Sequence, residues 1–153
     1  MKILFVCLGN ICRSPLLETV WRERAARAGI DCLVASAGTG AWHRGAGADR
    51  RAITAAARRG YPLDAHRARQ VQPADFESYD WLLAADMDNL RELERTRPPV
   101  ATAKLALALE FAGIAGVREV ADPYYGNDAD FDRVVELAER IADAVLHRRP
   151  LGA

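Results

Sequence analysis

Residues 2–20, KILFVCLGNICRSPLLETV, hold the features that decide the fold of this chain. They open with a short apolar run, KILFVC, whose β-branched and aromatic content is typical of a strand buried on both faces of a parallel sheet. A helix is predicted next, with Ser14 as its N-cap and Pro15 in its first turn. Apolar side chains then recur at helical spacing up to Gly29, where we expect the helix to end: Leu16, Leu17, Val20, Trp21 and Ala25.

The rest of the chain continues the alternation of strand and helix. Strands are predicted over 31–36, 80–85 and the first half of 104–113, and helices over 48–60, 87–97 and 128–149. The segment 104–113 also fits a helix, and the alternation before it favours a strand for its first half. Gly60 and Pro62 are expected to end one helix, and Asp86 to cap another. These patterns predict a single doubly wound α/β domain over residues 1–153, with a short, mostly parallel sheet.

The amino-acid composition limits the classes of protein to which this chain can belong. The chain has 153 residues, half of them apolar, with 21 basic and 21 acidic side chains. The balanced charge gives no reason to expect binding to nucleic acid or to a membrane surface. The start MKILFVCL imitates a signal peptide, but Gly9, Asn10 and Arg13 interrupt it, and no run approaches the ~20 apolar residues that span a bilayer. Three cysteines indicate free thiols in a reducing compartment, so we expect a cytoplasmic protein.

The segment CLGNICRSP lies where the first strand passes into the first helix. At such a point of a parallel sheet, loop N–H groups and a helix N-terminus face the same space, which suits an anion. Gly9 and Asn10 readily adopt the unusual backbone angles of a tight loop, and Arg13 offers a planar cation that can hold two oxygens. The segment therefore predicts a site for a tetrahedral oxyanion.

Cys7 stands at the base of this loop, where a positive environment favours the nucleophilic thiolate. The spacing Cys-x5-Arg closes a loop around one phosphate, so Cys7 can attack phosphorus while Arg13 and the loop N–H groups stabilise the equatorial oxygens. Ser14 can donate a hydrogen bond to the thiolate, and no metal or cofactor is required. The spacing alone is weak, because Arg is frequent in this chain. The alternative is that Cys7 is a small buried residue and Arg13 a solvated one.

Four separated motifs resemble those of the low-molecular-weight protein tyrosine phosphatases. They are CLGNICRSP, SAGT with a following Trp, HRARQV and DPYYG, in matching order from Lys2 to the final helix. The resemblance implies a flavodoxin-like three-layer fold, with a central four-stranded parallel sheet flanked by helices. It also implies two-step hydrolysis of phosphotyrosine through a phosphocysteine. Tyrosine-phosphorylated proteins would be the substrates and inorganic phosphate the product or inhibitor, and the chain would be a monomer or weak dimer.

By the same resemblance, Cys7 matches the nucleophile, Arg13 the phosphate clamp and Asp122 the general acid. A carboxyl group that faces a bound dianion keeps its proton more readily, and a phenolate leaving group needs one. The residues that match the phosphate-binding loop are Leu8, Gly9, Asn10, Ile11, Cys12 and Ser14. Without the family, Asp122-Pro123 would be interpreted as an ordinary turn.

The resemblance also assigns the surroundings of the loop. Trp42, Tyr124 and Tyr125 match the aromatic pocket walls, although a large aromatic such as Trp42 is more often a core residue. Ser36 and His66 match residues that hold the loop together with Asn10 and Ser14.

The remaining cysteines and histidines are not assigned to the chemical steps. Cys12 matches the family's second cysteine, which forms a reversible disulfide with the nucleophile and would protect Cys7 from irreversible oxidation. Cys32 is expected to be buried and inert. His43 and His147 are expected at the surface, and the scattered histidines give no metal site.

Three other functions remain open at this point. Arsenate reductases share the fold, but their chemistry needs additional cysteines. Protein arginine phosphatases carry a similar loop, usually with Thr where this chain has Ile11, and lack the tyrosine pair. A non-catalytic phosphotyrosine-binding module would need neither the thiol of Cys7 nor the acid of Asp122. The residues Ile11, Tyr124 and Tyr125 favour an aryl substrate.

Overall fold

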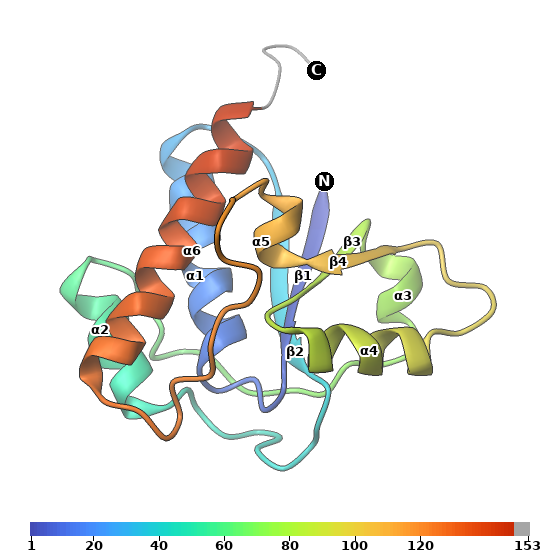
Figure 1. Cartoon of the computed structure of the whole chain (residues 1–153), viewed down its shortest axis with the longest axis horizontal. Helices are drawn as coiled ribbons and strands as arrows, with labels where there is room; N and C mark the ends of the chain where they lie inside the picture. Colours follow the sequence, from blue (N-terminus) through green and yellow to red (C-terminus); the bar gives the residue numbers. More distant parts are fainter. Residues whose placement is uncertain (149–153) are drawn as a thin grey trace.

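The computed structural model describes residues 1–148 and places a four-stranded sheet at the centre of the molecule (Figure 1). All neighbouring strands pair in parallel, in the order β2-β1-β3-β4. Their bounds are β1 Lys2–Cys7, β2 Leu33–Gly38, β3 Trp81–Ala84 and β4 Lys104–Leu107. Strand β1 is central because its apolar side chains from Ile3 to Val6 are fully buried between the two helical layers.

Helices cover both faces of the sheet and complete three layers (Figure 1). One apolar cluster joins the sheet to α1 (Arg13–Arg27), α2 (Arg50–Arg58), α5 (Ala108–Phe111) and α6 (Asp128–Arg148). A second cluster joins the opposite face to α3 (Asp75–Ser78) and α4 (Met87–Thr96). This arrangement is the predicted flavodoxin-like fold, in which the chain turns to opposite sides of the sheet after β1 and β3.

The carboxyl ends of β1, β2 and β3 meet at one edge of the sheet. Cys7 ends β1 and is paired with Gly38 at the end of β2, while Val6 is paired with Ala84 at the end of β3. A Cβ on Gly38 would lie 2.6 Å from the carbonyl oxygen of Leu8, so only glycine permits this close approach of β2 to the loop after β1. The loops that leave this edge are therefore brought within reach of Cys7.

Several predicted boundaries change in the structure. The second strand begins at Leu33 rather than at residue 31, and the third spans Trp81–Ala84. The short helix α3 was not predicted, because four residues carry no detectable periodicity. The strand in the first half of 104–113 is confirmed as β4. The final helix is confirmed through Arg148, and the predicted last residue, 149, lies outside the described residues.

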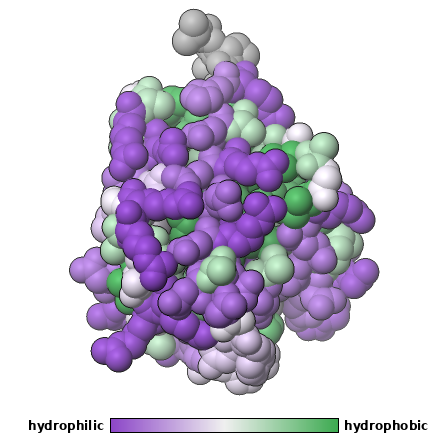
Figure 2. All heavy atoms as spheres, turned by 60° about the vertical axis from the view of Figure 1, so that its left-hand side comes forward, coloured by the Kyte–Doolittle hydropathy of each residue, from purple (hydrophilic) through white to green (hydrophobic). Residues whose placement is uncertain are grey.

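The face formed by α1, α2 and α6 is mostly hydrophilic (Figure 2), and ion pairs connect its helices. Glu139 of α6 accepts hydrogen bonds from Arg24 of α1 at 2.9 Å and from the Tyr61 hydroxyl at 2.7 Å, and it also pairs with Arg59. Burial alone would raise the pKa of Glu139, but the hydrogen bonds from Tyr61, Arg24 and Arg59 outweigh it and lower that pKa below its ordinary value. The carboxylate thus holds three segments together.

Replacing Glu139 with Gln should lower the free energy of unfolding at neutral pH by about 1–2 kcal/mol, because a neutral acceptor bonds the two arginines less strongly. The contribution of a carboxylate with a lowered folded pKa is present above its unfolded pKa of about 4.3, and it is lost as pH falls through the folded pKa. The difference between the two proteins in urea unfolding should therefore shrink in acid. Asp143→Asn, which removes a more exposed partner of Arg24, is the control. An equal loss at every pH would contradict the prediction.

Within residues 1–148, none of the helices combines the length and the apolar character needed to cross a bilayer.

Candidate active site

The loop between β1 and α1 encloses the base of a pocket. Asn10 has φ of 57°, and it is the only residue other than glycine with positive φ in the part of the chain that the structure describes. Gly9 does not adopt such an angle, contrary to prediction. Its lack of a side chain matters for another reason, because a Cβ there would lie 2.9 Å from Cδ2 of His43 and the imidazole would have to shift. The tight curl is therefore made at Asn10 alone, and Gly9 provides room for the neighbouring loop.

Ser14 lies against Cys7 rather than at the helix cap. Helix α1 begins at Arg13, with Cys12 as its N-cap residue, so the prediction that Ser14 caps the helix is wrong. The Ser14 Oγ is 2.9 Å from the Sγ of Cys7, and both side chains are buried. The hydroxyl is in contact with the sulfur and is not available to the helix N–H groups. This contact agrees with the expected hydrogen bond to the thiol group.

Asn10 determines which way the hydrogen bonds around Ser14 run. The backbone N–H of Arg69 donates to Oδ1 of Asn10 at 2.9 Å, and this fixes the orientation of the amide. Its Nδ2 then donates to the hydroxyls of Ser14 at 2.8 Å and Ser36 at 3.0 Å. Since the oxygen of Ser14 accepts this bond, its own proton can point at the sulfur of Cys7 at 2.9 Å, which is nearer than its other acceptor, the carbonyl of Ala37 at 3.4 Å. Asn10 is fully buried, which protects these bonds from water.

Two further side chains complete this network. His66 Nε2 lies 2.8 Å from the carbonyl oxygen of Asn10. Ser36 donates its hydroxyl proton to Oε1 of Glu18 at 2.6 Å. The structure thus brings Ser36 and His66 to Asn10 as the resemblance implied. Glu18 was missed, because its sequence position predicts only a polar residue on the first helix.

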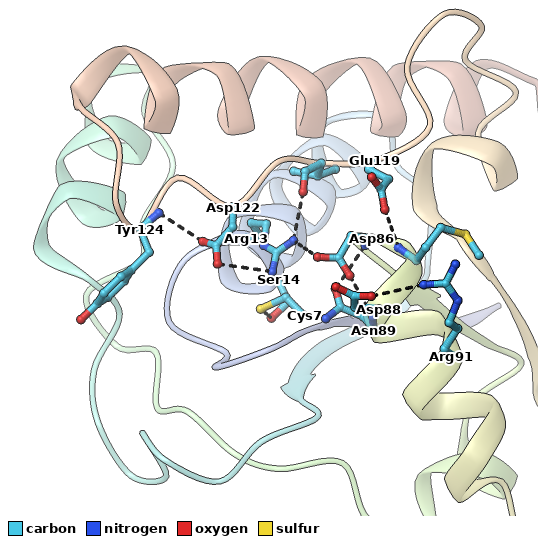
Figure 3. Close-up of polar contacts among 12 residues, drawn as sticks. Cys7, Arg13, Ser14, Asp86, Asp88, Asn89, Arg91, Glu119, Asp122 and Tyr124 are labelled. Carbon is cyan, nitrogen blue, oxygen red and sulfur yellow. Dashed lines mark hydrogen bonds and ion pairs between the residues drawn. The ribbon is translucent and has the colours of Figure 1, made fainter.

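Arg13 is buried at 3% exposure and fixed by two acceptors (Figure 3). Its Nη1 donates to Oδ2 of Asp86 at 2.6 Å and to the carbonyl of Val120 at 3.0 Å. Burial alone would lower the pKa of its guanidinium, but the facing Cys7 and the hydrogen bond to Asp86 outweigh it and raise that pKa. Arg13 therefore remains charged, and Asp86 limits its rotation.

Asp86 has a second role in addition to the predicted one. Its Oδ1 accepts the N–H of Asn89 at 2.8 Å, which confirms it as the cap of α4. Its other oxygen holds Arg13, a contact that the sequence analysis did not identify. The available signal was its position: Asp86 follows β3, which is paired with β1, and so lies at the same edge of the sheet as Cys7.

Asp122 comes from the long connection between α5 and α6 and lies beside Arg13 at the pocket (Figure 3). Its Oδ2 is 3.8 Å from Nη2 of Arg13, and its Oδ1 accepts the N–H of Tyr124 at 3.1 Å. The carboxylate is 45% exposed. The connection is held at this edge by the N–H of Val120, which donates to the carbonyl of Ala85 at 2.8 Å. Asp122 is thus positioned beside groups more than a hundred residues earlier in the chain.

The pocket itself has a volume of about 210 Å³ and an apolar rim. It is lined by Cys7, Leu8, Gly9, Ile11, Cys12, Arg13, Trp42, His43, Asp122, Tyr124 and Tyr125. Trp42 is 75% exposed, so it stands at the tip of a loop and not in the core. The rings of Tyr124 and Tyr125 meet edge to face, with centroids 4.9 Å apart. A planar group bound here would lie between these aromatic side chains, with Cys7 below it.

Comparisons with known proteins agree with this geometry. The family model of the low molecular weight phosphotyrosine protein phosphatases matches residues 2–149. The chain belongs to this family. A low molecular weight protein-tyrosine-phosphatase of Streptomyces coelicolor is 42% identical, over 95% of this chain and 91% of the relative.

Two solved structures extend the comparison. The protein tyrosine phosphatase of Entamoeba histolytica superposes with a TM-score of 0.90 at 36% identity, over 97% of this chain and 96% of the other. An arginine phosphatase from Drosophila superposes with a TM-score of 0.89 at 28% identity, over 96% of each chain. The fold and the family are therefore established.

The predictions for the remaining histidines and for Cys32 agree only in part with the structure. His43 was predicted only as a surface residue, and the structure places it half-buried in the lining of the pocket, near Gly9. His147 is exposed, as predicted. Cys32 is only half-buried and precedes β2, so the prediction that it is buried is wrong. Its sulfur accepts the indole N–H of Trp21 and lies 3.2 Å from the Met1 carbonyl. In residues 1–148, no group of His, Cys, Asp and Glu side chains is arranged to hold a metal ion.

Cys12 differs from Cys7 in its surroundings, although both thiols are free and line the pocket. Burial raises the pKa of the Cys12 thiol, and the negative charge of Asp49 raises it further. Cys12 therefore stays protonated in the physiological range. It is a poor nucleophile in this state, and the reversible disulfide with Cys7 remains a prediction.

Proposed function

We propose that this chain hydrolyses phosphotyrosine through a phosphocysteine on Cys7, with Arg13 as the phosphate clamp and Asp122 as general acid and base. The observation that carries the proposal is the placement of Cys7 at the base of an aromatic pocket, with Arg13 and Asp122 on one side of it. The loop residues from Leu8 to Cys12 and the Ser14 hydroxyl form the rest of the phosphate site. Tyrosine-phosphorylated proteins are the proposed substrates.

In the first step, Sγ of Cys7 attacks phosphorus opposite the phenolic oxygen. The S–P bond forms as the P–O bond to the ring breaks, and Asp122 gives its proton to the departing oxygen. Arg13 and the loop N–H groups hold the three equatorial oxygens, and Ser14 donates to the sulfur. Asp86 keeps the guanidinium of Arg13 in one orientation for this contact. The products are tyrosine and the phosphocysteine.

In the second step, a water molecule attacks the phosphocysteine. Asp122, now deprotonated, accepts a proton from this water as the new P–O bond forms and the S–P bond breaks. The electron pair of the broken bond returns to Cys7 as a thiolate, which the hydroxyl of Ser14 stabilises. Inorganic phosphate then leaves through the open mouth of the pocket, and it should also inhibit by occupying the same loop.

The aromatic rim supports an aryl substrate. Trp42, Tyr124 and Tyr125 offer ring faces and edges for a phenyl group, and Ile11 adds an apolar surface. An aliphatic phosphoserine is too short to place its backbone outside such walls. A phosphoarginine side chain is long enough but contributes no aromatic ring.

Hydrolysis of matched peptides that carry phosphotyrosine, phosphoarginine or phosphoserine tests the proposal. We expect kcat/KM for the phosphotyrosine peptide to exceed the other two by at least about tenfold, because only its ring fills the aromatic rim. Addition of a chelator should leave the rate unchanged, since thiolate chemistry needs no metal. Faster release of phosphate from phosphoarginine, or loss of activity with the chelator, would contradict the proposal.

A further inference from the structure

We propose that Arg51 is a positioning residue that joins the phosphate-binding loop to the loop of Asp122 and so keeps the general acid in place. Arg51 does not line the pocket, and it lies in the first turn of α2. The inference rests on the proposed function, because it concerns the delivery of a proton by Asp122.

The first half of this connection runs from the phosphate-binding loop to Arg51. The backbone N–H of Asp49 donates to the carbonyl of Ile11 at 2.8 Å, so the cap residue of α2 is attached to the loop that holds the phosphate. The carboxylate of Asp49 accepts from Nε of Arg51 at 3.1 Å and from Nη2 at 3.0 Å. This two-point contact fixes the plane of the guanidinium. Hydrogen bonding by Arg51 lowers the pKa of Asp49, so the pair stays ionised.

The second half runs from Arg51 to Asp122. Nη2 of Arg51 also donates to the carbonyl oxygen of Tyr124 at 2.9 Å. The guanidinium also lies over the ring of Phe131 on α6, with its Cζ 4.5 Å from the ring centroid, and this contact adds to its support. The N–H of the same Tyr124 donates to Oδ1 of Asp122 (Figure 3). Arg51 therefore contacts Tyr124, and the peptide N–H of Tyr124 orients the carboxylate of Asp122.

This support is needed because Asp122 lies on an exposed turn. Its carboxylate is 45% exposed and is 3.8 Å from Arg13, which is too long for a hydrogen bond. A proton donor displaced by about 1 Å loses much of its effect on the rate. The bond between Arg51 and the Tyr124 carbonyl restricts this turn without occupying the pocket, so the site stays open to substrate.

The test is Arg51→Met, measured as kcat/KM for two aryl phosphates that differ in their need for a proton. For phenyl phosphate, whose leaving group is poor, we expect a loss of about tenfold or more, because a misplaced Asp122 no longer protonates it efficiently. For para-nitrophenyl phosphate, whose leaving group departs more easily, the loss should stay below about threefold. Arg51→Lys, which keeps one charged donor, should recover part of the kcat/KM that Arg51→Met loses on phenyl phosphate.

The matched control is Arg58→Met, in the same helix. Arg58 donates to Asp132 of α6 at 2.9 Å and has no described bond to the turn of Asp122, so both kcat/KM values should be unchanged. Equal losses of Arg51→Met on the two substrates, or no loss on either, would overturn the inference while leaving the proposed function intact. Failure of the unmodified protein to hydrolyse either ester would overturn the proposed function and the inference with it.

Discussion

Cys7→Ser should abolish hydrolysis of aryl phosphates, with kcat reduced by at least about 10³-fold. The physical reason is that a serine hydroxyl is a much weaker acid than a thiol, and the side-chain hydrogen-bond partner described at this position is the Ser14 hydroxyl, which is not a base. The substitution changes one atom in a buried site, so the fold and the phosphate-binding loop should persist. The variant should therefore still bind inorganic phosphate, and unlike the unmodified protein it should yield no phosphocysteine when a reaction is quenched in acid.

The matched control is Cys32→Ser. Cys32 is the cysteine outside the pocket, and serine can accept the same hydrogen bond from the indole N–H of Trp21. Activity and thermal stability of this variant should be close to those of the unmodified protein. Turnover by Cys7→Ser comparable to that of Cys32→Ser would show that the nucleophile lies elsewhere.

Asp122→Ala should lower kcat by about 10²–10⁴-fold, the usual range for loss of a general acid and base. Both chemical steps should slow, because in the proposed mechanism the same carboxyl group protonates the phenolate and then activates water. Binding of inorganic phosphate should be kept or strengthened, since a negative charge 3.8 Å from Arg13 is removed. The measurement is a kinetic series over aryl phosphates together with a phosphate inhibition constant. A variant of this kind would also retain phosphoproteins long enough for them to be captured.

Asp88→Ala provides the comparison for Asp122→Ala. Asp88 lies near the same edge of the sheet, is 91% exposed and pairs with Arg91 (Figure 3). Its removal should leave kcat unchanged, because its carboxylate is not among the pocket residues. If both substitutions lowered kcat by a similar factor, the effect would be one of local charge, and the assignment of Asp122 as general acid would be wrong.

The fold was largely predictable because its elements carry strong periodic signals. The buried strand β1 and the amphipathic helix α6 are clear from the spacing of their apolar residues. The helix α3 was missed, and the limits of β2 and β3 shifted, because short elements are decided by pairing with neighbours. The order β2-β1-β3-β4 agrees with the flavodoxin-like fold that the family resemblance implied.

The site residues also divide into those that the sequence could predict and those that it could not. Cys7, Asn10, Arg13 and Ser14 could be predicted because one tight loop contains them all. Assignments for Asp122, Trp42 and His66 depended on a family resemblance, and the structure brings those residues to the loop. The contacts of Asp86, Glu18, His43 and Arg51 were not foreseen, since each depends on how separate elements pack.

The sequence by itself determined the chemistry that the loop 7–14 can perform, because local backbone conformation and residue type act over a few positions. The tertiary structure decided which partners that loop has. It placed Asp86 against Arg13 and Glu18 against Ser36. It also placed Arg51 where it bonds to the carbonyl of Tyr124 and, through Asp49, is connected to the carbonyl of Ile11. These contacts join residues 18 to 73 positions apart, and a hydrogen bond at that separation exists only when a packed core fixes both groups against the entropy of the chain.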